Sequence, residues 1–131
     1  MADALEKAAE DAGDRSLLRD ADSIRAPRGF WNYLDPCRAL AERFGATAVK
    51  TELAEIGVLQ TTLFGAAARD IANGQCDIGL IAGGEARHRA RRAKAQGQDE
   101  NLTAQPKGTL PDRVWRPSED ILSACEIGAG L

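Results

Sequence analysis

Cysteine and histidine are the side chains of this 131-residue chain that are best suited to nucleophilic or acid–base chemistry. Cys37 follows Asp35 and Pro36 in the first turn of a predicted helix, where the helix dipole favours a thiolate, but no partner residue lies beside it in the sequence. Cys76 follows the end of a predicted helix, where the dipole opposes a thiolate, so we predict an inert, packed thiol. Cys125 has no informative neighbours.

His88 is the only histidine, and it lies within a basic run that contains Arg87, Arg89, Arg91, Arg92 and Lys94. Such a run can bind the phosphates of coenzyme A or a nucleic-acid backbone, but a solvated helix face is its commoner explanation. Proteins that bind single strands usually place aromatic residues among the basic ones, and this run contains none. The net charge of −3 also offers no global attraction to nucleic acid. We therefore predict that nucleic acid is not a partner.

Two other features carry weak functional signals. The Gly83-Gly84-Glu85 segment lacks the spacing of both the Walker phosphate loop and the dinucleotide fingerprint. Trp31 and Trp115 lie in predicted loops, where they most simply cover local apolar surface. We predict no metal site.

The elements that would position these residues centre on the stretch from Gly57 to Glu85. Residues 58–72 are apolar on almost every side of a helix, which predicts a helix buried inside a domain. Gly74 supplies its stop in a left-handed conformation. Residues 77–82 then form an apolar run that predicts a strand covered on both faces.

The rest of the chain continues the same alternation. We predict helices at residues 3–12 and 35–44, with strands at 22–26 and 46–51. Parallel strands joined by crossover helices form a sheet covered on both faces, so the fold class is α/β. Beyond residue 86 we predict a basic helix, an extended surface loop over 97–117 and a short helix that begins at Ser118.

Composition limits the class of protein. The chain fits one domain, and its 44% hydrophobic and 28% charged residues are ordinary for a soluble globular protein. No run of about 18 apolar residues and no signal peptide is visible, so we predict no membrane partner. Three widely spaced cysteines argue against a disulfide framework and favour a cytoplasmic location.

The helix followed by Ile71-Ala-Asn-Gly74 and Cys76-Asp-Ile-Gly-Leu-Ile-Ala-Gly-Gly-Glu85 resembles the nucleophile helix and following strand of the thiolase superfamily. The resemblance implies a partial three-layer α/β sandwich with a mostly parallel sheet. Residues 1–86 would be the N-terminal lobe without its first strand. Residues 87–131 would hold the basic helix, the surface loop and a truncated start of the family's loop region.

The resemblance also implies a function in lipid metabolism. Thiolases transfer acyl groups between coenzyme A thioesters through a cysteine, and Gly57 stands at the position of that nucleophile. We therefore expect a truncated homologue of an acetyl-CoA acetyltransferase that is inactive by itself and has no confident catalytic residue. Its substrate class would be a coenzyme A thioester, with no covalently bound cofactor.

Three other functions remain open. The chain could be a non-catalytic module that binds coenzyme A thioesters or partners a catalytic subunit, or it could cleave acyl-CoA adducts as an aldolase does. Independently of the resemblance, the basic run could make it a phosphate- or RNA-binding domain. Thiolases pair through the strand before the nucleophile loop, so we expect a homodimer through Ala46, Thr47, Ala48, Val49, Lys50 and Thr51.

Overall fold

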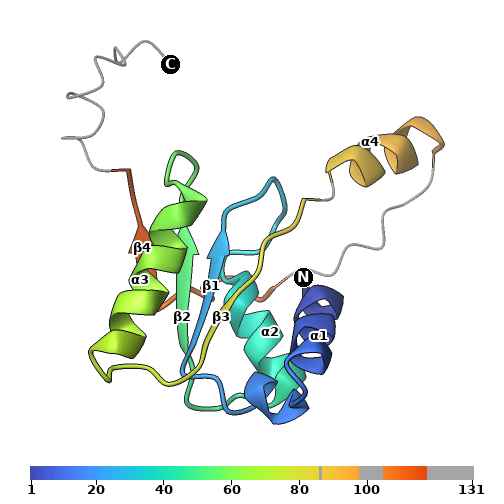
Figure 1. Ribbon diagram of the computed structural model, residues 1–131. Helices are drawn as coiled ribbons and strands as arrows, with labels where there is room; N and C mark the ends of the chain where they lie inside the picture. The colour runs from blue at the N-terminus through green and yellow to red at the C-terminus, as the bar shows by residue number, and fades with distance from the viewer. Residues whose placement is uncertain (86, 98–104, 118–131) are drawn as a thin grey trace.

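The computed structural model describes residues 1–85, 87–97 and 105–117 (Figure 1). Helices and strands alternate along the described chain, as the α/β prediction requires. In order, the elements are α1 (Ala2–Asp11), the 3-10 helix η1 (Arg15–Leu18), β1 (Ser23–Pro27), α2 (Pro36–Phe44), β2 (Lys50–Ala54), α3 (Gln60–Ala72), β3 (Gly79–Ile81), α4 (Arg87–Ala95) and β4 (Arg113–Trp115).

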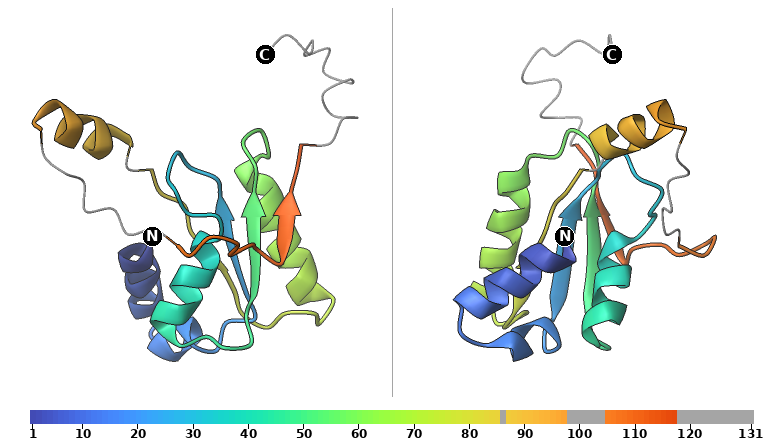
Figure 2. Two further views of the ribbon diagram at one scale, coloured as in Figure 1. Left: turned by 180° about the vertical axis from the view of Figure 1, so that it is seen from behind. Right: turned by 90° about the vertical axis from the view of Figure 1, so that its right-hand side faces the viewer.

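The four strands form one parallel sheet in the order β3-β1-β2-β4. The longest pairing joins β1 to β2, from Ser23 opposite Lys50 to Pro27 opposite Ala54. Helix α2 lies on one face of the sheet and α3 on the other, while α1 lies beside the β3 edge (Figures 1 and 2). Helix α4 projects beyond the carboxyl ends of the strands. The predicted α/β class is therefore confirmed.

Helix α2 shows why the start and stop signals were informative. Asp35 caps it, because its Oδ1 accepts a hydrogen bond from the backbone N–H of Arg38 at 2.9 Å. Pro36 follows in the first turn, where its missing N–H costs nothing. Gly45 ends the helix with φ +72°, a left-handed conformation that glycine adopts without steric cost. The prediction for residues 35–44 is confirmed.

Helix α3 corrects the prediction of a helix buried on all sides. It begins at Gln60 and buries only Leu63, Ala66 and Ala67, while Phe64 and Ile71 are 61% and 48% exposed. The reason is that one face packs on the sheet and the described residues supply no further layer beyond the other face. The predicted stop is confirmed, since Gly74 has φ +67°.

The strand predicted over residues 46–51 also needs correction. β2 spans Lys50–Ala54, because pairing with β1 begins only where Lys50 lies opposite Ser23. The preceding residues form the connection from α2, and Val49 is buried there at 5% exposure. β2 lies between β1 and β4, so it is not an open edge in this structure. Dimerisation itself stays a prediction.

The remaining strands differ from prediction in length and in number. β3 spans only Gly79–Ile81 at the sheet edge, and its residues are half-buried rather than covered on both faces. The segment predicted as a surface loop contributes β4, so it joins the same sheet as residues 1–86. A helix beginning at Ser118 falls outside the described residues. Within the described ranges, no helix has both the length and the apolar character needed to span a membrane.

Candidate functional site

The two faces of the sheet bury different kinds of side chain. Ile24 and Arg25 are neighbours on β1, and both are buried, with 0% and 1% exposure. Strand alternation points Ile24 toward α2 and Arg25 toward α3. In the paired register, Glu52 of β2 lies opposite Arg25 and is also completely buried. The α3 side of the sheet therefore contains an ionic cluster at its centre.

Arg25 holds this cluster together through its guanidinium group. Its Nη2 donates to Glu52 Oε1 at 3.1 Å and to Asp70 Oδ2 of α3, and its Nη1 donates to Ser23 Oγ at 3.1 Å. Its Nε is buried and has no hydrogen-bond partner among the described residues. Two carboxylates around one guanidinium partly repay the large cost of removing these charges from water.

Glu52 extends the cluster to the neighbouring strand. Its Oε2 accepts a 2.6 Å hydrogen bond from Trp115 Nε1, and Lys50 Nζ lies 3.7 Å from its Oε1. The guanidinium of Arg113 stacks on the Trp115 ring, 3.6 Å from its centroid. The short strand β4 is thus held to β2 by side chains as well as by backbone pairing.

A cavity of about 350 Å³ opens beside this cluster, at the amino ends of the strands. Its lining includes Asp22, Gln75 and Cys76 in addition to the cluster residues. Asp22 Oδ2 accepts hydrogen bonds from the backbone N–H groups of Asp77 and Ile78, at 2.8 and 2.9 Å. The charges here are paired with one another, so the arrangement stabilises the β1–β2–α3 packing rather than presenting a reactive group.

The carboxyl ends of parallel strands are where open α/β sheets place their ligands. Gly57 lies there, in the turn from β2 to α3, with φ +103°. A Cβ atom added at this glycine would lie 3.0 Å from Cγ of Pro117. Conformation and space therefore both favour glycine at this turn, which is the position that the thiolase resemblance would assign to a nucleophile.

A cavity of about 130 Å³ lies at this same carboxyl edge, beside the first turn of α3. Its lining is mostly apolar and consists of Pro27, Gln60, Leu63, Phe64, Ile81 and Gly83. The residue that caps α3, Leu59, makes no side-chain cap hydrogen bond. The N–H of Thr62 donates to the Leu59 carbonyl at 3.0 Å, so the N–H groups of Gln60 and Thr61 are the ones left without a partner among the described residues, open to a carbonyl or anionic oxygen.

Gly83, Gly84 and Glu85 form the third part of this edge. Glu85 Oε2 accepts a hydrogen bond from the backbone N–H of Phe30 at 2.7 Å, and the Gly84 carbonyl accepts one from Trp31 Nε1 at 3.0 Å. These contacts attach the aromatic loop after β1 to the chain after β3. Glu85 accepts hydrogen bonds from backbone N–H groups as part of this attachment, so the segment does not form a phosphate loop.

The described cysteines are packed thiols. Cys37 is completely buried, and burial, reinforced by the nearby charge of Asp35, raises its pKa to about 12. Desolvation thus outweighs the favourable helix dipole that the sequence indicated. Cys76 is also buried, with its Sγ 3.6 Å from Ser23 Oγ. Cys125 lies outside the described residues, and His88 is exposed on α4 and lines neither of these cavities.

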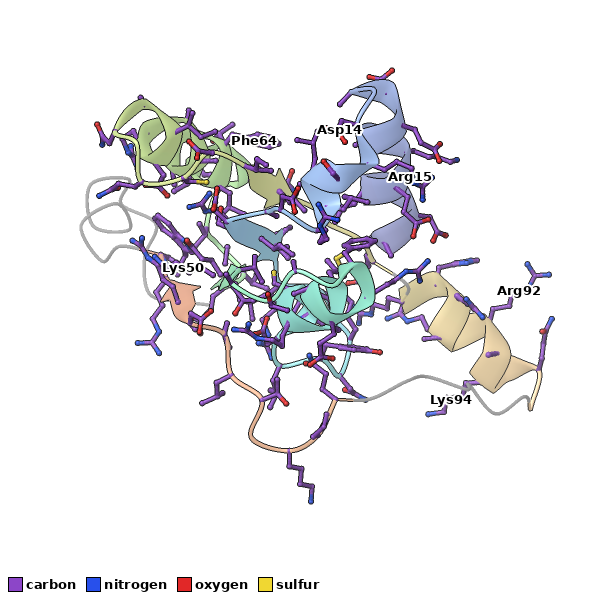
Figure 3. The ribbon with its side chains drawn as sticks, turned by 90° about the horizontal axis from the view of Figure 1, so that it is seen from below. Asp14, Arg15, Lys50, Phe64, Arg92 and Lys94 are labelled. Atoms are coloured by element: carbon purple, nitrogen blue, oxygen red, sulfur yellow. The ribbon has the colours of Figure 1, made fainter. Side chains whose placement is uncertain are left out.

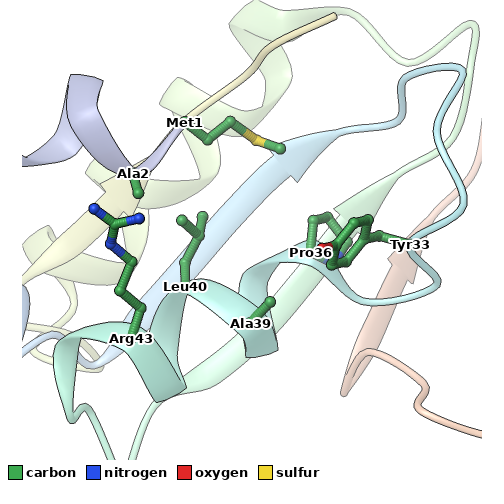
Figure 4. Close-up of a pocket in the computed structure, with 7 residues that line it drawn as sticks. All are labelled: Met1, Ala2, Tyr33, Pro36, Ala39, Leu40 and Arg43. Carbon is green, nitrogen blue, oxygen red and sulfur yellow. The ribbon is translucent and has the colours of Figure 1, made fainter. Parts of the chain in front are cut away.

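A further cavity of about 250 Å³ lies between the start of α1, α2 and the loop before it (Figure 4). Its lining is mainly apolar, with Tyr33 toward one end and Arg43 toward the other. Arg43 Nη2 is already 3.1 Å from Glu6 and 3.6 Å from Asp3. Its charge is therefore neutralised by α1, and this cavity offers no free cation for a ligand.

Sequence reasoning missed Arg25, Glu52 and Asp70. The available signal was the alternation of Ser23-Ile-Arg25 and Lys50-Thr-Glu52, but alternation with charged residues ordinarily predicts a solvent-facing strand side. Only the position of α3 over these residues shows that they are buried.

Comparison with known proteins adds no relative. No protein-family model, no curated protein and no solved structure matches this chain. Among residues 1–85, 87–97 and 105–117, no group of three or more histidine, cysteine, aspartate or glutamate residues is placed to hold a metal ion. The features that bear on function are therefore the amino and carboxyl ends of the strands described above.

Proposed function

We propose that the chain is a thiolase-like module that binds coenzyme A thioesters at the carboxyl edge of its sheet without becoming acylated. The observation that carries the proposal is the turn at Gly57. By the resemblance it corresponds to the family's nucleophile position, between β2 and α3, yet it has a positive φ of +103° and an added Cβ would lie only 3.0 Å from Pro117 Cγ. Acyl transfer through a covalent intermediate requires a nucleophile at that point.

Two features of the edge favour thioester binding. The N–H groups of Gln60 and Thr61 at the start of α3, which have no partner among the described residues, can donate to a thioester carbonyl oxygen. The adjoining cavity is lined by Leu63, Phe64 and Ile81, and its volume of about 130 Å³ suits a short acyl group. Binding without transfer is the non-catalytic alternative that the sequence left open, and it accounts for both features together.

An acetyltransferase would need groups that the described residues do not provide. Its acid and base would come from histidine and cysteine, but His88 does not line the cavity at this edge and both described cysteines are buried. An aldolase-type reaction would need Glu55 as its base, and the carboxylate of Glu55 lies 3.8 Å from Arg116 Nε.

Calorimetric titration with acetyl-CoA and with free coenzyme A tests the proposal. We expect acetyl-CoA to bind more tightly, because only its acyl group reaches the apolar cavity. Phe64→Gln should weaken acetyl-CoA binding about tenfold, the loss of roughly 1.4 kcal/mol of apolar contact. Ile71→Gln removes an exposed apolar residue elsewhere on α3 and is the matched control. Equal affinities for the two ligands, or equal losses in the two variants, would count against the proposal.

A further inference from the structure

Helix α4 concentrates positive charge more than any other described element. Its nine residues include Arg87, Arg89, Arg91, Arg92 and Lys94 together with His88, and they include no acidic residue. All six of these side chains are exposed, and no residue of the helix is buried. Since the whole chain has a net charge of −3, the residues outside α4 are strongly acidic. Positive charge is therefore concentrated on this one helix.

The cations of α4 lack acidic partners within the described chain. None of the ion pairs found among the described residues involves α4. Arg87 makes the one cation–π contact of α4 found among the described residues, since its guanidinium lies 4.6 Å from the centroid of the Phe30 ring. The other four permanent charges are therefore available to a partner.

These charges also oppose the helix that carries them. Like charges at i and i+4, such as Arg87 and Arg91, destabilise a helix, and cations near its N-terminus oppose the dipole. No buried apolar face compensates for this repulsion. A partner that neutralises the cations would therefore stabilise α4 as well as bind it.

The arrangement of the cations around the axis indicates the shape of that partner. At 3.6 residues per turn, the basic side chains cover an arc of about 220°, and the remaining arc holds Ala90 and Ala93, which are half-buried. Figure 3 shows Arg92 and Lys94 pointing to opposite sides of the helix. A flat anionic surface could contact only part of such an arc.

We propose that α4 is a docking element for B-form DNA, bound through the phosphates on both walls of the major groove and without sequence specificity. That groove is about 12 Å wide and admits an α-helix, whereas the major groove of A-form RNA is too deep and narrow. Insertion into lipid would require an apolar face, and alanine supplies almost none. The missing aromatic residues, which argued against nucleic acid from sequence, matter for single strands and not for a duplex.

Fluorescence anisotropy with a labelled 20-bp duplex of mixed sequence tests this proposal on the whole chain. We expect micromolar affinity at 50 mM salt and a log–log salt slope of about −4, the value for four phosphate contacts. Arg91→Gln with Arg92→Gln should weaken binding by at least about tenfold and halve the slope. Both residues are exposed on a helix without buried residues, so this variant keeps the rest of the fold.

Lys7→Gln with Lys107→Gln is the matched control, because it removes the same charge from exposed residues outside α4. It should change the affinity less than twofold, and circular dichroism should show a gain of helix when the unmodified chain binds duplex. Equal losses in the two double variants would overturn the proposal. So would equal or tighter binding of polyglutamate, of vesicles containing phosphatidylserine, of A-form RNA or of single-stranded DNA.

Discussion

Ile24 and Arg25 are adjacent on β1 and equally buried, yet they face two chemically opposite interiors. On the α2 side, Ile24 packs among aliphatic residues of α1 and α2, such as Leu5 and Leu40. On the α3 side, Arg25 contacts two carboxylates and a hydroxyl. The comparison teaches that apolar burial surrounds Ile24 and matched charges surround Arg25. Neither face is uniform, since Thr51 and Asp35 are buried as a hydrogen-bonded pair on the α2 side and Leu63 is buried on the α3 side.

The two interiors constrain the fold in different ways. Apolar burial is non-directional, so many arrangements of the α2 face would satisfy it. The ionic face is satisfied only when Arg25 lies opposite Glu52 and α3 brings Asp70 over both. Moving β2 by one residue would turn Glu52 to the other face and leave a buried guanidinium without its partner. The ionic cluster thus favours the observed strand register.

The largest expected effect comes from removing one member of the cluster. Arg25→Met should lower the free energy of unfolding by about 3–5 kcal/mol, because it leaves the buried Glu52 carboxylate without its guanidinium. Urea denaturation measures the change. The double variant Arg25→Met with Glu52→Met should recover most of the loss, since well-packed apolar residues can replace a buried ion pair. A double variant less stable than the single one would contradict this account of the ionic face.

The neighbouring position tests the apolar face. Ile24→Ala should cost about 3 kcal/mol through lost apolar burial and the cavity left behind. Because no charge is involved, the loss should be the same in 0.05 and 0.5 M sodium chloride. A loss of unfolding free energy below about 1 kcal/mol would show that the α2 face packs loosely, and it would contradict the claim that apolar burial holds that face.

The end of α3 is the next test, because α3 carries Asp70 to the ionic face. Gly74→Val should destabilise the protein by about 1–2 kcal/mol, since Gly74 has φ +67°. Gly65 is the control within the same helix, where an added Cβ meets no atom within 4 Å. Gly65→Ala should raise the stability by about 0.5–1 kcal/mol. Equal melting of Gly74→Val and the parent chain would place the helix end elsewhere.

The smallest expected effect concerns Asp112, which joins the loop before β4 to β2. The backbone N–H of Thr51, helped by its hydroxyl and by Arg38, lowers the pKa of Asp112 below its ordinary value of 3.8. Its stabilising contribution is therefore complete above pH 3.8 and is lost as the pH falls through the lowered pKa.

Urea midpoints between pH 6 and pH 3 measure this contribution. Asp112→Asn should lose less stability over that range than the parent chain, because the titrating carboxylate is gone. Asp11→Asn, at an exposed position of α1, is the control and should follow the parent. If the parent chain, Asp112→Asn and Asp11→Asn had identical pH profiles, the contact of Asp112 with Thr51 and Arg38 would not stabilise the protein in solution.

Local signals in the sequence predicted much of the fold but little of its interior. Asp35, Pro36, Gly45 and Gly74 act on the backbone within a few residues of themselves, so the positions of α2 and of the α3 stop followed from residue type alone. β4 is only three residues long and depends on side-chain contacts with β2, which no local pattern reveals.

The candidate site was predictable in part for the same reason. Gly57 was identified by its place in a resemblance, and its φ of +103° and the nearby Pro117 give a physical reason for glycine. The ionic cluster depends on residues 45 positions apart, Arg25 and Asp70, meeting across the sheet and α3. Such a contact is set by tertiary packing, which charge alternation along one strand cannot indicate.

The most direct test of the central claim is to incubate the purified chain with acetoacetyl-CoA and coenzyme A. Absorbance reports cleavage, and intact-protein mass spectrometry reports any acyl group on the protein. We predict no cleavage above background and no acetyl adduct, in the parent chain and in Gly57→Cys alike, because the described residues that line the cavity at this edge include no histidine or cysteine to act as the acid and base of acyl transfer. Turnover above background, or a stable acyl adduct on any cysteine, would contradict the account.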